Sequence, residues 1–494
     1  MLNPVRRTLL SITAAVLVLG ALAIGGVGYA WNTADIDRSG NVDFDRPLLI
    51  PPLADSVVEP DGTRVFDLRM QSGTTDLGHG QTPTWGVNGS YLGPTLRAER
   101  GERIRIDVEN SLPEASTLHW HGMHLPAAMD GGPHQVIDAD GGTWSPTWTV
   151  DQPAASLWYH PHLHGATADR VYRGLAGMFL IDENGPPLPD TYGVDDIPLI
   201  VQDKKFRDEE LDDSSALFVN TGILGDEILV NGTPGPYLDV TSERVRLRVL
   251  NASNARVYDF AFSTGLEFDQ IATDGGFLET PHRTDHLRLT PGERAEIVVK
   301  VPAGTSSVLR SEPADLGVGF WAGRFGGADD RFDILELRAD ENLTANATVP
   351  ATLVELEDLG KPTRTREFTL AESSRINGEE MDPSRVDEVV TLGDTEIWRI
   401  HNASGQIHNF HVHDVQFQVQ NPGDPSQSGA KDTVYIPPND TVDLLMRFTD
   451  YADTTVPYMY HCHILRHEDN GMMGQFVVVE PGQEVELIPH SGHG

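Results

Sequence analysis

The stretch Glu102-Arg-Ile-Arg-Ile-Asp-Val-Glu-Asn110 decides the fold, because the chain repeats its pattern twice more. The two further copies are Glu243-Arg-Val-Arg-Leu-Arg-Val-Leu-Asn251 and Asp394-Thr-Glu-Ile-Trp-Arg-Ile-His-Asn402. In the first copy Ile104, Ile106 and Val108 alternate with charged residues, which predicts a β-strand with one face in a core. An Asn-Gly pair, which favours a tight turn between strands, precedes each copy. The chain is therefore predicted to be a triplicated β-domain.

Length and composition agree with three β-domains. A chain of 494 residues is too long for one hydrophobic core, and a typical domain of roughly 150 residues suggests about three. Gly (48) and Pro (33) are frequent, and apolar patterns of helical period are scarce, which favours an all-β fold. The formal net charge of -38 would repel phosphate backbones and anionic lipid, so we expect no nucleic-acid partner.

The first 30 residues have the layout of an export signal. Arg6 and Arg7 precede a largely apolar run from Leu9 to Ala30. The arginine pair suggests the twin-arginine export route. Because about 20 apolar residues can span a bilayer, the run could also remain as a membrane tether. We therefore expect an extracytoplasmic protein that is secreted, periplasmic or attached to the cell surface.

Paired histidines recur at equivalent positions of the outer copies. The residues nine and eleven positions beyond each terminal Asn share one face of a strand. In the middle copy these residues are Phe260 and Phe262, which shows that the same face can simply be packed. In the outer copies they are His119 with His121, and His411 with His413. This pattern predicts a metal held between the first and third domains, with the second domain as a spacer.

Four histidine clusters carry the chemistry of the chain. They are His119-Trp120-His121-Gly122, His160-Pro161-His162-Leu163-His164-Gly165, His408-Asn409-Phe410-His411-Val412-His413, and His461-Cys462-His463 followed by His467 and Met472. Cys462 is the one cysteine of the chain, so no intrachain disulfide can form. Histidine with cysteine and a more distant methionine is the ligand set of a blue-copper electron-transfer site.

In these four motifs the sequence resembles the multicopper oxidases, the family of laccases, bacterial cuprous oxidases, spore-coat laccase and bilirubin oxidase. The resemblance covers roughly residues 60 to 482. It implies three consecutive cupredoxin-like Greek-key β-barrel domains and four copper ions, one of type 1, one of type 2 and two of type 3. The expected segments are an export signal or anchor (1–30), a linker (31–59), domain 1 (60–186), domain 2 without copper ligands (187–345), a linker (346–365), domain 3 with type 1 copper (366–482) and a tail (483–494).

The resemblance also implies the copper ligands by position. Type 1 copper is assigned His408, Cys462, His467 and the weak axial ligand Met472. Type 2 copper is assigned His119 and His411. The type 3 pair is assigned His121, His162, His164, His413, His461 and His463. His160 matches no ligand of the family and is expected either to contact a ligand or to be structural.

The alternation of a strand gives the His461-Cys462-His463 segment a physical meaning. Its two imidazoles point to one side and the thiolate to the other, so electrons that enter at Cys462 are one residue from the cluster that reduces O2. Asp130 and Glu468 match acids that the family uses to relay protons. Because O2 reduction consumes four protons in a buried site, we prefer this role over that of solvated surface carboxylates.

The reducing substrate is less well defined by the sequence. Ser404 and Gln406 stand where the cuprous oxidases place a carboxylate and a methionine, and soft Cu(I) favours thioether ligands. We therefore expect a monomeric, laccase-like oxidase of phenols or aromatic amines, with O2 and a small reductant as partners. A metallo-oxidase for Cu(I), Fe(II) or Mn(II) is the first alternative. A cupredoxin-fold copper-binding or scaffold protein without turnover is the second.

Overall fold

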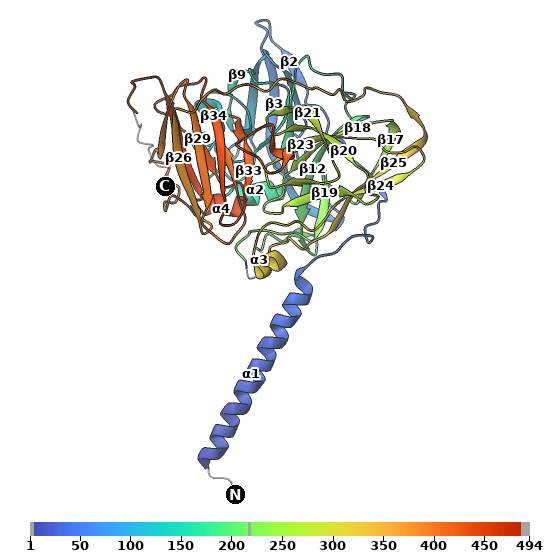
Figure 1. Cartoon of the computed structure of the whole chain (residues 1–494), viewed down its shortest axis with the longest axis vertical. Coiled ribbons are helices and arrows are strands. Elements are labelled where there is room, and N and C mark those ends of the chain that lie inside the picture. Colours follow the sequence, from blue (N-terminus) through green and yellow to red (C-terminus); the bar gives the residue numbers. More distant parts are fainter. Residues whose placement is uncertain (1–3, 216–218, 486–494) are drawn as a thin grey trace.

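Three β-domains form the body of the molecule, as the computed structural model shows for residues 4–215 and 219–485 (Figure 1). Each domain packs two sheets face to face around its own core, and these cores contain Trp120, Phe260 and Trp398, respectively. The predicted all-β class and the three cupredoxin-like domains are confirmed. The helices are few and short apart from the first.

The first domain places two histidine strands in its smaller sheet. This sheet contains β5 (Leu96–Glu99), β11 (Gly177–Asp182), β10 (Ala155–His160) and β7 (His119–His121). The other sheet contains β2 (Ser56–Val58), β3 (Arg64–Asp76), β4 (Gln81–Val87), β6 (Arg103–Asn110), β8 (Gly142–Trp144) and β9 (Thr147–Thr149). The short helices are η1 (Ala127–Met129) and α2 (Thr167–Arg173).

The second domain contains the largest pair of sheets among the three domains. One sheet contains β1 (Arg46–Pro47), β17 (Pro236–Ser242), β25 (Phe332–Thr344), β24 (Ser306–Ser311), β19 (Tyr258–Phe262) and β22 (Leu287–Leu289). The other contains β16 (Thr233–Pro234), β15 (Glu227–Val230), β12 (Asp196–Lys204), β18 (Val245–Asn251), β23 (Arg294–Val299), β20 (Phe268–Thr273) and β21 (Gly276–Thr284). A hairpin of β13 (Phe206–Arg207) and β14 (Glu210–Leu211) and the helix α3 (Phe320–Phe325) complete it.

The third domain repeats the arrangement of the first. One sheet contains β27 (Arg375–Ile376), β26 (Arg364–Ala371), β29 (Thr395–Asn402), β34 (Thr441–Arg447), β31 (Phe417–Val419) and β32 (Ala430–Lys431). The other contains β28 (Glu388–Thr391), β36 (Met473–Val479), β35 (Tyr458–His461), β30 (His408–Val412) and β33 (Thr433–Ile436). Its short helices are η2 (Pro425–Gln427) and α4 (Leu465–Asp469).

The three repeated strands occupy the same place in each domain. β6, β18 and β29 pair in parallel with β3, β12 and β26, respectively. The asparagine that ends each copy has one structural task. Asn110, Asn251 and Asn402 each donate two side-chain hydrogen bonds to backbone carbonyls and accept one from the backbone N–H two residues later. The repeated sequence pattern, an acid followed by alternating residues and a final asparagine, therefore corresponds to a repeated structural element.

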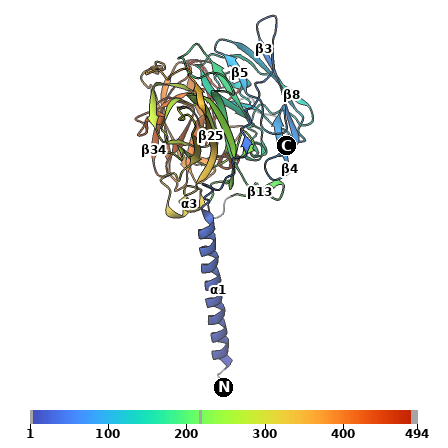
Figure 2. The same cartoon turned by 90° about the vertical axis from the view of Figure 1, so that its right-hand side faces the viewer.

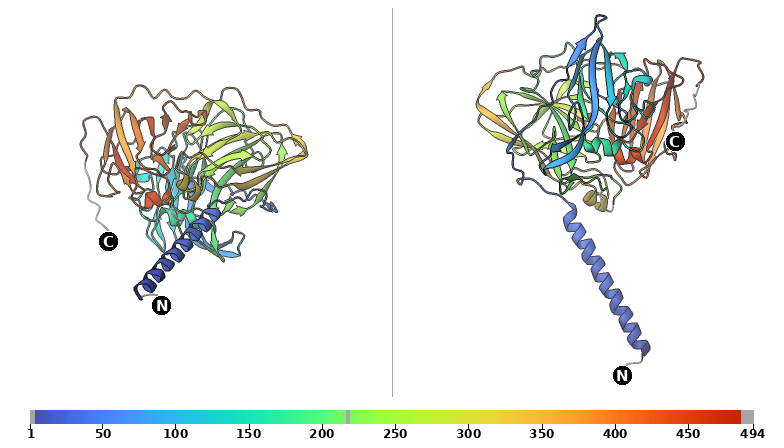
Figure 3. Two further views of the ribbon diagram at one scale, coloured as in Figure 1. Left: turned by 60° about the horizontal axis from the view of Figure 1, so that its bottom comes forward. Right: turned by 180° about the vertical axis from the view of Figure 1, so that it is seen from behind.

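The N-terminal segment divides into a projecting helix and a strand. Helix α1 (Pro4–Ala34) extends away from the body in every view (Figures 1, 2 and 3), and Trp31 near its end stacks on Phe320 of α3 at a centroid distance of 4.4 Å. Within the described residues we find no helix long and apolar enough for a membrane crossing. Part of the expected linker 31–59 belongs to the second domain, because β1 pairs with β17 and Leu48 lies in that core.

The first and third domains are fastened together beside the histidine clusters. Helix α2 of the first domain packs against α4 of the third. The carboxylate of Asp469 accepts hydrogen bonds from the backbone N–H groups of Thr167 (2.8 Å) and Ala168 (3.0 Å), the free donors at the start of α2. This contact fixes the two halves of the site relative to each other.

Candidate metal centre

Eight buried histidines meet between the first and third domains. Strand pairing brings them together, since His160 faces His119 across β10 and β7, and His411 faces His461 across β30 and β35. All eight side chains are at most 1% exposed. The eight are His119, His121, His160, His162, His411, His413, His461 and His463.

Six of these imidazoles form two groups of three. In one group Nε2 of His461 lies 3.0 Å from Nε2 of His162 and 3.3 Å from Nε2 of His413. In the other group Nδ1 of His121 lies 3.3 Å from Nε2 of His160, and the His463 ring centroid lies 4.9 and 5.2 Å from theirs. Burial is the main cause that holds the pKa of all six well below its usual range. All six are therefore neutral, the form of imidazole that binds metal.

His119 and His411 form the remaining pair. The Nδ1–H of His119 donates to the carbonyl of Asp130 (2.9 Å), and the Nδ1–H of His411 donates to the carbonyl of Asp432 (2.8 Å). These bonds leave the lone pair of each ring on Nε2. Neither Nε2 has a hydrogen-bond partner among the described residues, and the same is true of both nitrogens of His463. Buried unpaired lone pairs are costly, so this donor set fits bound metal ions.

The structure places His160 and His164 differently from what the motif predicted. His160 is fully buried among the other rings, whereas the side chain of His164 is exposed. The structure therefore brings His160, and not His164, to the clustered rings. Strand β10 ends at His160, and the chain then turns through Gly165, whose φ is +77°. Both His-X-His spacings in His160-Pro161-His162-Leu163-His164 fit a strand equally well, but the strand stops before the second one.

A separate site lies on the other side of the His461-Cys462-His463 segment. The Sγ atom of Cys462 lies 3.5 Å from Nδ1 of His408 and 3.6 Å from Nδ1 of His467, and all three residues are completely buried. Burial lowers the pKa of His467 to about 4 and raises the pKa of the Cys462 thiol to about 12. A metal that binds here must therefore displace the thiol proton.

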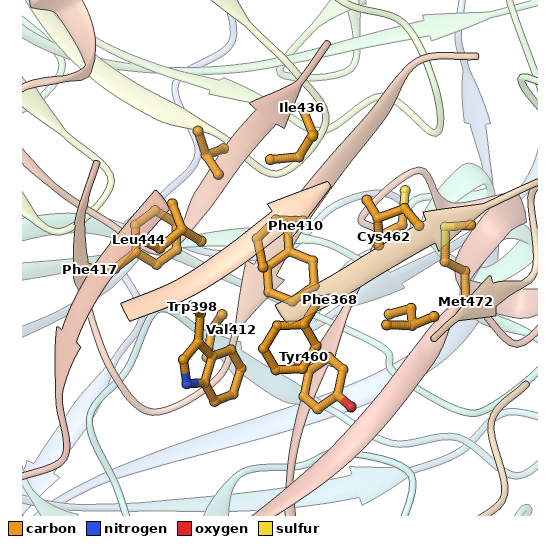
Figure 4. Close-up of a cluster of buried hydrophobic side chains, with 14 of the residues drawn as sticks. Phe368, Trp398, Phe410, Val412, Phe417, Ile436, Leu444, Tyr460, Cys462 and Met472 are labelled. Atoms are coloured by element: carbon orange, nitrogen blue, oxygen red, sulfur yellow. The ribbon is translucent and has the colours of Figure 1, made fainter. Parts of the chain in front are cut away.

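Two adjacent methionines behave differently at this site. Met472 belongs to the same buried cluster as Cys462, and Figure 4 shows the two side chains beside each other at one end of the aromatic core. The backbone N–H of Cys462 also donates to the carbonyl of Met472 (3.1 Å). Met473 instead packs with Met381 and Met459. The structure thus brings Met472, and not Met473, to the cysteine.

The two predicted acids lie against the clustered histidines. Asp130 accepts a hydrogen bond from Nδ1 of His413 (2.7 Å), and its other oxygen lies 3.3 Å from Nδ1 of His119. Glu468 lies 3.2 Å from Nδ1 of His461 and 3.5 Å from that of His162. Burial raises the pKa of Glu468 well above its usual range, and Asp469 adds to the effect. Both carboxyl groups are at most 2% exposed, which rules out solvated surface carboxylates.

Two residues beside the cluster escaped the sequence analysis. Asp432 accepts a hydrogen bond from Nε2 of His121 (3.0 Å), and both of its oxygens accept from Arg294 of the second domain (2.7 and 2.6 Å). No local motif marks either residue, because their contact joins positions far apart in the chain. Only a buried charge pair in the folded molecule reveals them.

The fold and the site define a copper-binding protein built from cupredoxin-like domains. Family models described as multicopper oxidase match residues 69–185, 201–307 and 349–482. The multicopper oxidase mco of Staphylococcus haemolyticus is 34% identical over 87% of this chain and 92% of its own. The crystal structure of laccase from Pediococcus acidilactici is 32% identical, with a TM-score of 0.79 over 88% of this chain and 94% of its own.

The chain belongs to the multicopper oxidase family. Membership implies copper binding and an oxidoreductase. A further relative, the cell division protein FtsP of Dickeya dadantii, is 35% identical over 96% of this chain and 98% of its own.

Proposed function

We propose that the chain binds four copper ions, takes electrons singly from a small aromatic reductant and delivers them to O2, which is reduced to water. The observation that supports this proposal most strongly is a set of eight buried imidazoles beside a separate His-Cys-His site; four of the eight have a nitrogen without a hydrogen-bond partner among the described residues. In this proposal His408, Cys462 and His467 hold type 1 copper with Met472 as axial ligand, and His119 and His411 hold type 2 copper. The type 3 ligands are His121, His160 and His463 for one copper, and His162, His413 and His461 for the other.

In this proposal the residues of the chain connect the two copper sites, exclude water from them and supply protons. Bound copper would supply one-electron oxidation at Cys462 and four-electron reduction of O2 at the histidine cluster. Cys462 joins the two sites covalently, because its neighbours His461 and His463 each belong to one group of three. Complete burial of these side chains excludes bulk water. Asp130 and Glu468 lie where each can pass a proton toward the cluster.

Removing the transferable protons should slow one half of the reaction. Asp130→Asn and Glu468→Gln keep the side-chain shapes, so we expect reoxidation of the reduced protein by O2 to slow by about 10²–10⁴-fold, the usual contribution of a positioned acid. Reduction by substrate should stay normal. Stopped-flow measurements of the two half-reactions separate these effects, with exposed Glu480→Gln as the control. Wild-type reoxidation rates in both buried variants would contradict the proton role.

Weakening the axial ligand should make the type 1 site a stronger oxidant. A thioether donates some electron density to Cu(II), so Met472→Leu should destabilise the oxidised form and raise the reduction potential without loss of copper. Reluctant substrates should then be oxidised faster where electron entry limits turnover. Met473→Leu is the matched control, because Met473 packs with Met381 and Met459. A redox titration in which only the control shifts would show that the ligand is misassigned.

A pocket of 260 Å³ beside the type 1 site supports an aromatic substrate. Its lining includes the apolar side chains of Leu316, Val318 and Trp321, together with Gln406, whose Oε1 has no hydrogen-bond partner among the described residues. Asn220 also lines it and accepts a hydrogen bond from Nε2 of His467 (2.6 Å). A phenol or aromatic amine could stack there and donate to Gln406. The described lining holds neither a carboxylate nor a thioether for a metal ion.

Oxygen uptake with a panel of reductants tests the substrate class. We expect a phenol and an aromatic amine to support faster uptake than Cu(I), Fe(II) or Mn(II). Trp321→Ala should raise the KM for the phenol and leave the KM for a metal ion unchanged. Faster uptake with one of the three metal ions, insensitive to Trp321→Ala, would identify a metallo-oxidase instead.

A copper-binding or scaffold role without turnover is the second candidate. It is favoured by the likeness to a protein named for cell division. Such a protein would consume no oxygen with any reductant, even when copper is bound. The buried unpaired imidazole nitrogens argue against a scaffold that binds no metal. Oxygen uptake by the copper-loaded protein separates the oxidase from a copper-binding protein without turnover.

A further inference from the structure

The second domain contributes none of the clustered histidines, yet its Arg294 contacts Asp432, a residue that is hydrogen-bonded to two of them. Arg294, at the start of β23, forms a two-pronged contact with Asp432 of the third domain, with Nη1 to Oδ1 at 2.7 Å and Nη2 to Oδ2 at 2.6 Å. Both side chains are fully buried. A parallel pair of charge-assisted hydrogen bonds fixes the plane of the carboxylate as well as its position.

Asp432 passes this orientation to one histidine from each outer domain. Its Oδ1 atom accepts from Nε2 of His121 (3.0 Å), and its backbone carbonyl accepts from Nδ1 of His411 (2.8 Å). Thr433 adds a third link, because its hydroxyl lies 2.9 Å from Asp432 Oδ1 and 3.2 Å from His411 Nδ1. One residue thereby sets which nitrogen of each ring is left for metal.

Arg294 is itself held by all three domains. Besides Asp432, its guanidinium donates to the carbonyls of Ser156 in the first domain (3.0 Å) and of Gly292 (3.0 Å) and Asp274 (3.1 Å) in the second. A lysine ammonium could not make this set of hydrogen bonds, whereas the planar guanidinium of Arg294 is held in a single position by them.

The tight packing around Gly122 is independent evidence for the position of the Arg294–Asp432 pair. The residue directly follows His121 and has φ +84°. A Cβ atom at this position would lie 2.5 Å from Asp432 Oδ2 and 2.6 Å from Arg294 Nη2. The glycine of the His119-Trp120-His121-Gly122 motif is therefore required by the ion pair as well as by its backbone conformation.

We propose that Arg294 is a positioning residue for the type 2 and type 3 coppers, acting through Asp432 on His121 and His411. The inference rests on the proposed copper sites. It gives the second domain a part in the metal centre, where the sequence predicted only a spacer.

Copper content and spectra of the full chain test the proposal. Arg294→Met leaves the Asp432 carboxylate without its partner, so we expect the affinity for type 2 and type 3 copper to fall by about 10–100-fold, the usual cost of losing such an orienting contact. The type 2 electron paramagnetic resonance signal should weaken or change its hyperfine splitting, while the blue type 1 absorption remains. Arg294→Lys, which keeps the charge without the fork, should recover part of the signal.

Lys431→Met is the matched control. This buried lysine pairs with Asp274 (2.8 Å) and Glu293 (3.0 Å) one residue from Asp432, without contacting the histidines. It should lower thermal stability and leave the type 2 signal intact. If Arg294→Met fails to fold, Asp432→Asn, which keeps the shape and removes the charge, should give the same type 2 change.

Failure of the positioning role and failure of the proposed function give different results. The parent protein must first be blue and show a type 2 signal. If Arg294→Met then shows the same type 2 signal as the parent, the positioning role is overturned and the proposed function is not. Where only Asp432→Asn folds, an unchanged signal in that variant has the same meaning. A parent protein that binds no copper at all would overturn the proposed function itself.

Discussion

Cys462→Ser should lose the blue colour of the protein and its oxidase activity while keeping three of four coppers. The intense absorption of a type 1 site needs a thiolate, and a serine hydroxyl is too hard a ligand to replace it. The imidazoles of His461 and His463 face away from Cys462, so the trinuclear site should still fill. Turnover should fall to the background level, because electrons can no longer enter at Cys462. Visible absorption and copper analysis measure both effects.

This experiment has an unusually clean reading, since Cys462 is the one cysteine of the chain. Met473→Leu is a suitable control for damage to the neighbouring core. Strong blue absorption in Cys462→Ser would exclude the type 1 assignment, because no other thiolate could produce it.

Exchanging His160 for Gln should disrupt the type 3 pair. His160 is completely buried, and its Nε2 lies 3.3 Å from Nδ1 of His121 within one group of three imidazoles. Gln keeps polarity and approximate size but is a poor copper ligand. We therefore expect copper loss from the cluster and O2 reduction at the background level, with type 1 absorption retained. Copper analysis and the near-ultraviolet absorption of the coupled copper pair report the change.

His164→Gln is the matched control in the same short segment. Its side chain is exposed, so copper content and turnover should equal those of the parent protein. The opposite pattern, with a normal His160→Gln and an inactive His164→Gln, would restore the ligand assignment made from the motif alone.

Local patterns predicted the parts of the structure that local physics determines. The alternation in β6 follows from one buried face, and the terminal asparagines recur because each makes the same three hydrogen bonds. In β18 the alternation did not predict burial, because Arg248 on its other face is buried as well and pairs with Asp196. The alternation of His461, Cys462 and His463 likewise predicted which side chains would point apart. His160 and His164 could not be separated in this way, because the end of β10 depends on the turn that follows it.

Contacts between segments that are distant in the chain could not be predicted from the sequence. The pair of Arg294 and Asp432 joins the second and third domains, and neither residue has a neighbour that marks it. The strand β1 was taken for linker, because two residues carry too little pattern to show that they extend a sheet.

The histidine cluster is divided between the first and the third domain, and this has a consequence for the order in which its parts are synthesised. A nascent chain that ends before residue 400 carries four of the eight imidazoles and none of the His408, Cys462 and His467 donors. A ribosome-bound fragment of that length therefore cannot form the complete histidine cluster or the site of His408, Cys462 and His467. The complete donor set therefore exists only after the third domain has been synthesised and has docked onto the first.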